Sequence, residues 1–469
     1  MRFRAVLIAL LVALPAAAAS FDGLFLDKTM RLDYFHTATP AGEEIVALDS
    51  IVSDGVWSGS RTRLLDTLNL GKYYFEVIDR ATNQVIFSRG FASVYSEWVT
   101  TPDAKKRPAT FHESLRFPWP KNPVQVVLKK RDEENSFQQV WSTVVDPNSR
   151  FVNPADPEPA GRVWSLIENG PPSTKVDLLI IGEGYTAAEM PKLRGDTERL
   201  VGKLFATEPF KSRKGDFNVR VLELPAAKSG VHRPRTSDDR RTVTGVQYNI
   251  FDSERYILTL DNKALRNAAS SAPYDFIEIL VNEKQYGGGG IFNDQATTSV
   301  DSGFSEYVFV HEFGHHFAGL GDEYYTSDVA YETGGVDHPE PWEPNVTANG
   351  TNPKWMELVT PGTPLPTPWD KEAFEKRQRE YQAERRQLRD ANVPEERMDE
   401  LFRRSQATET KFLGSQKYAG RVGAFEGAGY EAKGLYRPEA DCIMFTRNEV
   451  GFCDVCTRAI QRVIDLYAE

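Results

Sequence analysis

The pentapeptide His311-Glu312-Phe313-Gly314-His315 constrains this chain more than any other stretch of it. Residues four apart lie about 40° apart around a helix, so both imidazoles project from one face and can bind the same metal ion. Glu312 stands close enough to take a proton from a water that Zn2+ activates, which is chemistry suited to peptide hydrolysis. The spacing therefore predicts a helix that binds one Zn2+ per chain through His311 and His315, with Glu312 as the general base.

The residues after this pentapeptide offer a third ligand. Two glycines end the predicted helix, and Asp322 and Glu323 follow at once, so either carboxylate can fold back towards the histidines. Asp322 is the preferred ligand, and Glu323 is the alternative. Three protein ligands leave the fourth position of a catalytic zinc to water, whereas a structural zinc is closed by four.

Two other interpretations of the histidines have to be weighed. An amphipathic core helix with incidental histidines would show the same pentapeptide. His316 lies about 140° around the helix from His311, off the ligand face, and is expected to support the site or to lie on the surface.

The order of these residues resembles the metzincin clan, in which H-E-x-x-H-x-x-G-x-x-H/D precedes a methionine turn. Here the glycine and the acid each come one residue late, at Gly319 and Asp322. The segment Asp441-Cys442-Ile443-Met444 supplies a candidate methionine turn, and ordinary core packing of Met444 is the alternative.

Some metzincins carry a tyrosine two residues after this methionine as an oxyanion donor. The chain has Thr446 there, so the role is absent or is taken by another residue, such as Tyr430 or Tyr436.

A narrower resemblance rests on four runs of sequence. They are Val176 to Glu189 (VDLLIIGEGYTAAE), His311 to Tyr325 (HEFGHHFAGLGDEYY), Gly434 to Met444 (GLYRPEADCIM) and Phe452 to Ile460 (FCDVCTRAI). Over roughly residues 160 to 469 the chain resembles the IgA-specific metallopeptidase family, which also has an amino-terminal β-rich domain. The resemblance implies a zinc endopeptidase with His311, His315 and Asp322 as ligands and Glu312 as base, and it implies no preference for immunoglobulin.

The first nineteen residues have the form of a secretory signal. Arg2 and Arg4 precede an apolar core, and Ala16-Ala17-Ala18 forms a small-residue cleavage site. The apolar stretch is shorter than the ~20 residues that span a bilayer, and no later segment is a transmembrane candidate. We therefore expect a secreted or periplasmic protein.

The net charge of the chain limits the classes of partner that it can bind. The chain of 469 residues has a formal net charge of −11, which argues against nucleic acid as a main partner. The expected partner is a polypeptide substrate, and the sequence leaves the oligomeric state open.

All three cysteines fall near the carboxyl terminus, at Cys442, Cys453 and Cys456. In an oxidising compartment one disulfide can form, and we expect Cys442 to pair with Cys453 or Cys456. A Cys-rich zinc site is the competing interpretation, which the absence of a nearby fourth His or Cys disfavours.

Periodicity divides the chain into two parts. Residues 20–152 alternate apolar and polar in short runs, which predicts a β-sandwich, and a Pro-rich linker follows at 153–165. In residues 166–469, apolar runs at Val176 to Ile181, Phe217 to Leu224 and Phe276 to Val281 alternate with helical patterns. The predicted fold class is α+β multidomain: an N-terminal β-sandwich, then an α/β metzincin-like zincin catalytic domain.

Two segments of the catalytic domain are harder to interpret. The glycine run in residues 286–293 lacks the Gly-Lys-Ser/Thr of a phosphate loop, so it is either a cleft rim on which substrate pairs in β fashion or a flexible loop. Residues 370–412 predict a helical hairpin insertion with a break at Asn392-Val393-Pro394. This hairpin is a candidate lid or exosite, and a solvated projection without function is the alternative.

Together these patterns predict a secreted zinc endopeptidase. One alternative is a catalytically silent surface protein that binds protein or glycan and holds a structural zinc, which an intact Glu312 disfavours. Another is a zinc amidase acting on cell-wall peptide, which the sequence does not separate from the first.

Overall fold

The computed structural model describes residues 20–236, 239–326 and 338–469. The predicted secretory signal, residues 1–19, lies outside the described residues. In the described ranges the chain forms a mixed α and β structure with several sheets, which confirms the α+β organisation. None of the helices in these ranges combines the length and apolar character needed to cross a bilayer.

The N-terminal part contains two four-stranded sheets that share one apolar core. Their facing rings meet across it, as Phe75 and Phe117 do with centroids 6.3 Å apart. The first sheet has the order β5-β1-β2-β8 and the second β4-β3-β6-β7. The strands are β1 (Phe25–Ala38), β2 (Glu44–Ser53), β3 (Tyr73–Asp79), β4 (Val85–Phe91), β5 (Ala109–Pro120), β6 (Val124–Arg131), β7 (Phe137–Val145) and β8 (Val152–Asn153).

The C-terminal part is built on a six-stranded sheet with the order β15-β16-β14-β10-β11-β9. Its four inner strands are parallel, and both edge strands run antiparallel to their neighbours. The strands are β9 (Arg162–Ile167), β10 (Val176–Glu183), β11 (Phe217–Glu223), β14 (Phe276–Val281), β15 (Gly288–Ile291) and β16 (Gln295–Ser299). Every residue of β10 and β14 is buried, as expected for strands covered on both faces.

Helices cover both faces of this sheet. One face packs against α3 (Met190–Leu204), α5 (Ser305–Ala318) and α8 (Asp454–Tyr467), and the other against α4 (Asn262–Ala269). A capping box between Thr186 and Glu189 opens the segment that leads into α3. The shorter elements are α1 (Phe21–Leu24), α2 (Val94–Trp98), β12 (Val246–Gln247), β13 (Leu258–Thr259), β17 (Phe425–Ala428) and β18 (Glu431–Arg437).

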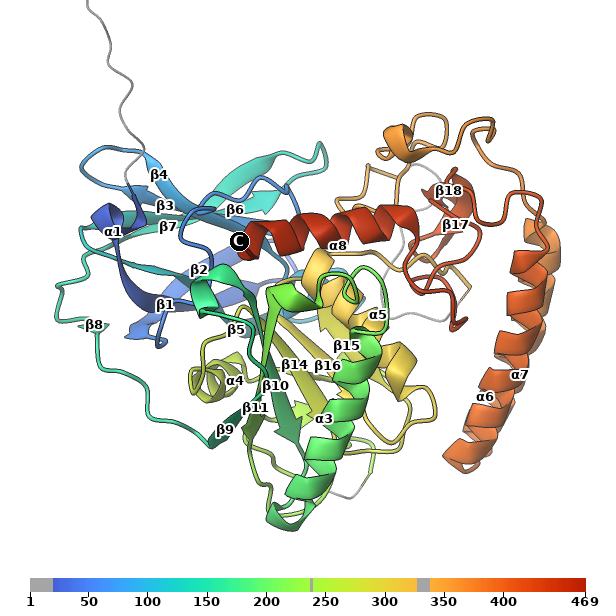
Figure 1. The fold of residues 1–469 in the computed structure, drawn as a ribbon, viewed down its shortest axis with the longest axis horizontal. Helices are drawn as coiled ribbons and strands as arrows, with labels where there is room; N and C mark the ends of the chain where they lie inside the picture. The colour runs from blue at the N-terminus through green and yellow to red at the C-terminus, as the bar shows by residue number, and fades with distance from the viewer. Residues whose placement is uncertain (1–19, 237–238, 327–337) are drawn as a thin grey trace, which may run out of the picture.

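Two long helices, α6 (Lys371–Asp390) and α7 (Glu395–Gly414), form a hairpin. Figure 1 shows the hairpin at the right edge, opposite the N-terminal sheets at the left, with the six-stranded sheet between them. The apolar stripe of the hairpin packs Met398, Leu401 and Phe402 against Phe304 and Val308 at the start of α5. The hairpin therefore rests on the helix that carries the His-Glu-His group.

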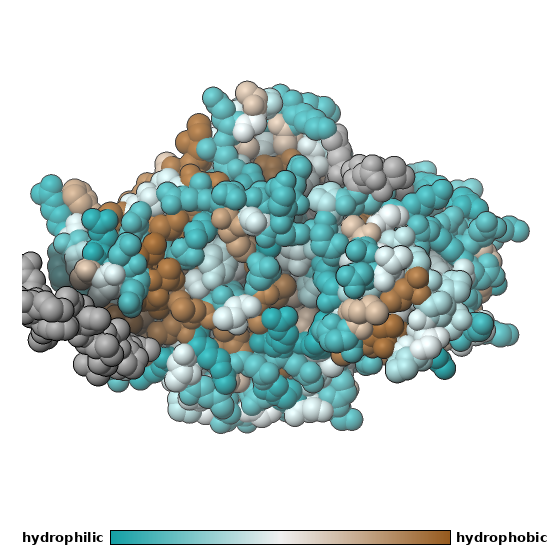
Figure 2. All heavy atoms as spheres, turned by 90° about the horizontal axis from the view of Figure 1, so that it is seen from above, coloured by the Kyte–Doolittle hydropathy of each residue, from teal (hydrophilic) through white to brown (hydrophobic). Residues whose placement is uncertain are grey.

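The two parts of the chain contact each other through buried polar groups. Asp54 accepts hydrogen bonds from Arg31, Arg116 and the hydroxyl of Tyr274, which lies in the C-terminal part. The Arg116 guanidinium also lies 3.5 Å from the centre of the Tyr274 ring. The face seen in Figure 2 is mostly hydrophilic, and hydrophobic residues gather towards its N-terminal side at the left.

Candidate metal centre

The last two turns of α5 present His311, Glu312 and His315 together. The Nε2 atoms of the two histidines lie 3.1 Å apart, and a carboxylate oxygen of Glu312 is within 4.8 Å of both rings. The helix ends at Gly319, whose φ of 60° lies in the left-handed region that glycine adopts without strain. The chain then turns back towards the histidines.

This return brings Asp322 onto the two imidazoles. Its Oδ1 lies 3.2 Å from His311 Nε2 and 3.1 Å from His315 Nε2. Ligands about 2.0 Å from a tetrahedral zinc would be roughly 3.3 Å apart, so these three atoms are spaced as three ligands of one ion. Asp322 Oδ1 is buried and accepts no hydrogen bond, which is expected of an oxygen reserved for a metal. The donor set therefore fits a zinc ion.

The far sides of these ligands are held in place. His311 Nδ1 lies 3.0 Å from the carbonyl of Ile443, and His315 Nδ1 donates to the carbonyl of Leu320 at 2.5 Å. The hydroxyl of Tyr430 donates to Asp322 Oδ2. Each contact leaves the inner atom free for a metal, and such outer contacts fix the orientation of metal ligands.

Glu323, the alternative third ligand, points away from the histidines. It is fully buried, and Asn345 donates to its Oε1 at 2.9 Å. The same oxygen lies 3.5 Å from Cys456 Sγ. The structure thus brings Asp322 to the two histidines and places Glu323 among the cysteines.

Met444 lies beneath the site. A Cβ added to Gly314 of α5 would lie 3.1 Å from Met444 Sδ, so the helix and the methionine are closely packed. The carbonyl of Met444 accepts a hydrogen bond from the N–H of Glu323 at 2.9 Å. This turn therefore supports both the helix and the segment that carries Asp322.

Of the residues considered for an oxyanion role, only Tyr430 reaches the site. Tyr436 packs its ring over Gly350 and does not line the cleft described below. Thr446 donates to Asp441 Oδ1 at 2.6 Å within the methionine turn.

Glu312 lines a cleft of about 460 Å³. Burial raises the pKa of its carboxyl group, and the neighbouring His311 and His315 act in the opposite direction. The carboxylate of Asp322 adds to the rise. Burial also holds the pKa of Glu278, fully buried on β14, well above its usual range, and the charge of Glu312 adds to that shift. A raised carboxyl pKa is the direction expected of a general base that later acts as an acid.

Both parts of the chain line this cleft. The N-terminal part contributes Ser96 and Glu97, and the C-terminal part contributes Arg255, Tyr324 and other residues. Glu97 accepts a hydrogen bond from the hydroxyl of Tyr256, which joins the two walls. Sequence reasoning did not predict that these residues line one cleft, since all but Tyr324 lie outside the motifs and their contact depends on how the two parts pack.

His316 is buried rather than exposed, and it has a structural role. Its Nδ1 donates to the carbonyl of Ile291, 2.9 Å away, and its Nε2 accepts from the N–H of Ile277 at 3.1 Å. Burial lowers its pKa to about 3, so the ring is neutral. His316 thereby links α5 to β14 and β15.

The glycine run forms the edge strand β15, and close packing requires its glycines. A Cβ on Gly290 would lie 2.3 Å from the carbonyl oxygen of Glu312, and one on Gly289 would lie 2.4 Å from the Tyr256 ring. Part of the outer edge is already paired, because Gly288 exchanges hydrogen bonds with Arg255 and Ile257. The run is therefore an ordered strand, and Gly290 lines the cleft beside Glu312.

The expected disulfide is absent. Cys442, Cys453 and Cys456 are all free and buried, and their sulfur atoms gather with the carboxylate of Glu323. The sequence prediction was wrong here because it did not anticipate that a distant carboxylate would join the three thiols.

A helix that presents two histidines and a glutamate beside a cleft, with an aspartate next to the two imidazoles, is the arrangement typical of metallopeptidases. Residues 164–464 match the family described as IgA Peptidase M64, and residues 20–142 match the Peptidase M64 N-terminus. The chain belongs to the IgA peptidase M64 family, which confirms the resemblance drawn from its motifs. A comparison with curated proteins found no match to the chain.

Proposed function

We propose that this metallopeptidase is a zinc-dependent endopeptidase that hydrolyses extracellular or periplasmic proteins. The observation that carries the proposal is the triangle of His311 Nε2, His315 Nε2 and Asp322 Oδ1, with separations of 3.1 to 3.2 Å. A structural zinc would need a fourth protein ligand and would have no use for Glu312. This argues against a silent binding protein.

The residues of the site have separate roles in the proposed reaction. When bound, a zinc ion supplies the Lewis acidity that polarises a peptide carbonyl and acidifies water. Glu312 accepts a proton from the attacking water at a carboxylate oxygen and later donates it to the leaving amine nitrogen. His311, His315 and Asp322 would hold the ion, and Tyr430 orients Asp322.

We infer that an extended peptide lies along β15. Gly290 lines the cleft, and an edge strand can pair with a substrate backbone. Such pairing uses main-chain groups and leaves side-chain selection to the cleft walls, which include Glu97 and Arg255. We propose that the N-terminal part is a β-sandwich that contributes to substrate selection. We propose that the C-terminal part has a metzincin-like fold.

The proposal also covers where the protein acts and how substrates reach the cleft. The signal-like form of residues 1–19 supports secretion or a periplasmic location. The hairpin of α6 and α7 rests on the start of α5, close enough to the cleft to act as an exosite for folded substrates. The family description does not fix the substrate of this chain.

The test is hydrolysis of an unbiased peptide library by the mature protein and by Glu312→Gln, with zinc measured on both. We expect the variant to hold as much zinc as the wild type and to lose about 10²- to 10⁴-fold in rate, the usual contribution of a general base. Equal cleavage by both proteins would remove Glu312 from the mechanism. No cleavage by either zinc-loaded protein would favour a non-catalytic role.

A further inference from the structure

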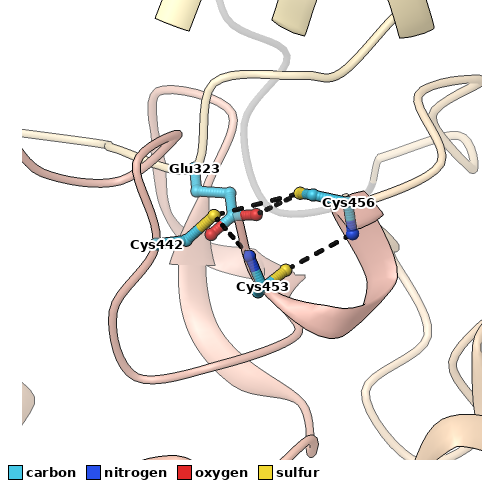
Figure 3. Close-up of side chains that lie close together, drawn as sticks. All are labelled: Glu323, Cys442, Cys453 and Cys456. Carbon is cyan, nitrogen blue, oxygen red and sulfur yellow. Dashed lines mark hydrogen bonds between the residues drawn. The ribbon is translucent and has the colours of Figure 1, made fainter. Parts of the chain in front are cut away.

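Four buried side chains meet on the side of the Asp322-Glu323 turn that faces away from the histidines. Glu323, Cys442, Cys453 and Cys456 each offer one ligand atom, and these atoms all lie within 4.8 Å of one another. Figure 3 shows the three sulfur atoms and the carboxylate gathered around a common space. The side chains come from three places in the chain: the turn after α5, the methionine turn and the start of α8.

Two distances among these atoms match those of a tetrahedral thiolate site. With Zn–S about 2.3 Å and Zn–O about 2.0 Å, two sulfurs would lie roughly 3.8 Å apart and a sulfur and an oxygen roughly 3.5 Å apart. The distance from Cys442 Sγ to Cys456 Sγ is 3.9 Å, and that from Cys456 Sγ to Glu323 Oε1 is 3.5 Å. Both distances agree with ligands of one ion.

Glu323 is also short of partners for a buried carboxylate. Asn345 donates to Oε1 at 2.9 Å, but Oε2 is buried and accepts no hydrogen bond. An unpaired buried carboxylate oxygen is costly, and a cation would remove the cost. This orphaned oxygen is a second observation, independent of the sulfur spacing, that indicates a ligand.

The surroundings favour a thiolate at Cys442. Cys442 Sγ accepts from the N–H groups of Met444 at 3.5 Å and Cys453 at 3.4 Å. Cys453 caps the N-terminus of α8, where the helix dipole favours negative charge. The fully buried guanidinium of Arg437 acts on Glu323 and supplies a nearby positive charge.

We propose that Glu323, Cys442, Cys453 and Cys456 form a second metal site, which binds one Zn2+ through three thiolates and one carboxylate. Each thiol loses its proton to solvent as its sulfur–metal bond forms, and no atom changes oxidation state. Four protein ligands leave no position for water, so this site is structural and not catalytic. The proposal stands whether or not the chain is a peptidase.

A metal at the cysteine site would link the segments that pack around the histidine centre. Glu323 follows Asp322 directly, and Cys442 is two residues before Met444. A metal at the cysteines would therefore hold the Asp322 turn, the methionine turn and α8 in fixed relation.

The test is metal content of the full-length mature chain, purified without chelator or reductant. We expect two zinc ions per chain in the wild type, one in Cys456→Ser and one in His315→Ala. Glu323→Gln should weaken the cysteine site far more than the histidine centre, since the amide can still bond to Asn345 but is a poor zinc ligand. A single zinc that survives Cys456→Ser and is lost in His315→Ala would overturn the proposal.

A measurement on protein with all three cysteines intact covers the case in which the cysteine variants fail to fold. Loading His315→Ala with Co2+ should give the near-ultraviolet absorption of cobalt bound to thiolates, which histidine and carboxylate ligands do not give. Alkylation of the unfolded wild type without reductant should modify all three thiols. Absence of the cobalt band, or modification of only one thiol because a disulfide joins the other two, would count against a metal site.

Discussion

The contact between Tyr430 and Asp322 shows how one hydroxyl can orient a carboxylate towards a candidate metal site. Tyr430 holds Oδ2, which leaves Oδ1 directed at the two histidines. Contacts of this kind are typically worth 10- to 100-fold in metal affinity.

We therefore expect Tyr430→Phe to lower zinc affinity at the histidine centre by about 10- to 100-fold, measured by competition with a chelator. Tyr436→Phe is the matched control, because that tyrosine does not line the cleft. An unchanged affinity in Tyr430→Phe would show that Asp322 needs no such support.

His36 is a residue whose charge bears on stability. It is fully buried between Glu113 and Glu44, each 2.9 Å from a ring nitrogen. Burial alone would lower its pKa, but the two carboxylates outweigh burial and raise the pKa to about 9.

Because the folded pKa of His36 exceeds the unfolded value of about 6.5, its stabilising contribution is complete below about pH 6.5 and is lost as pH rises through about 9. Urea unfolding of the wild type should therefore show stability falling over this window. His36→Gln should show a smaller decrease in the free energy of unfolding over the same pH range. If the two proteins lose stability in parallel, the decrease comes from other groups.

At the scale of elements, α5 and β15 pack so closely that only glycine fits between them. A Cβ on Gly290 would lie 2.3 Å from the Glu312 carbonyl oxygen and 3.0 Å from His315 Cβ. Side chains and backbone must shift to admit it, and overpacking of this kind costs about 1 to 3 kcal/mol.

Gly290→Ala should accordingly lower the free energy of unfolding by about 1 to 3 kcal/mol and reduce hydrolysis as α5 moves. Gly195→Ala is the control, because Gly195 lies in α3 and a Cβ added there would meet open space. This variant should raise the free energy of unfolding by about 0.4 to 1 kcal/mol. Equal stability of the two variants would contradict the packing argument.

The elements also show what the sequence could and could not predict. The pairing of His311 with His315 follows from helical spacing, and the buried strands β10 and β14 follow from continuous apolar runs. The neighbours of Glu323 do not follow, because Cys456 is 133 residues away along the chain. Periodicity carries no information about which distant segments meet, so the fourth partner of the three cysteines was missed.

The same limit applies to β15. Four glycines in a row suggested either a flexible loop or a strand, and the choice depends on α5 and Tyr256 packing against them. Tertiary contact, rather than local propensity, makes this run an ordered edge.

At the scale of the whole molecule, the N-terminal part is bound to the rest of the chain by charge as well as by apolar contact. Asp54 is buried and bridges Arg31 and Arg116, and Arg116 also donates to the carbonyl of Tyr274 across the interface. Removing the charge of Asp54 would leave Arg116 without its buried partner, whereas Arg31 would keep its contact with Asp33.

We expect Asp54→Asn to destabilise the protein by about 3 to 5 kcal/mol, measured by chemical unfolding, and to loosen the contact between the two parts. Asp27→Asn removes the partner of Arg61 at an exposed ion pair and should change stability by about 0 to 1 kcal/mol. A small effect in both variants would mean that apolar contacts alone hold the parts together.

The adjacent residues Asp322 and Glu323 face opposite ways, one towards the histidines and one towards the cysteines. Two metal sites that share a single peptide unit cannot fill independently, since an ion in either one fixes the backbone that the other requires. By thermodynamic linkage, whatever factor the first ion adds to the affinity for the second, the second must add to the affinity for the first. Loss of zinc on dilution should then be cooperative, with few chains holding only one ion.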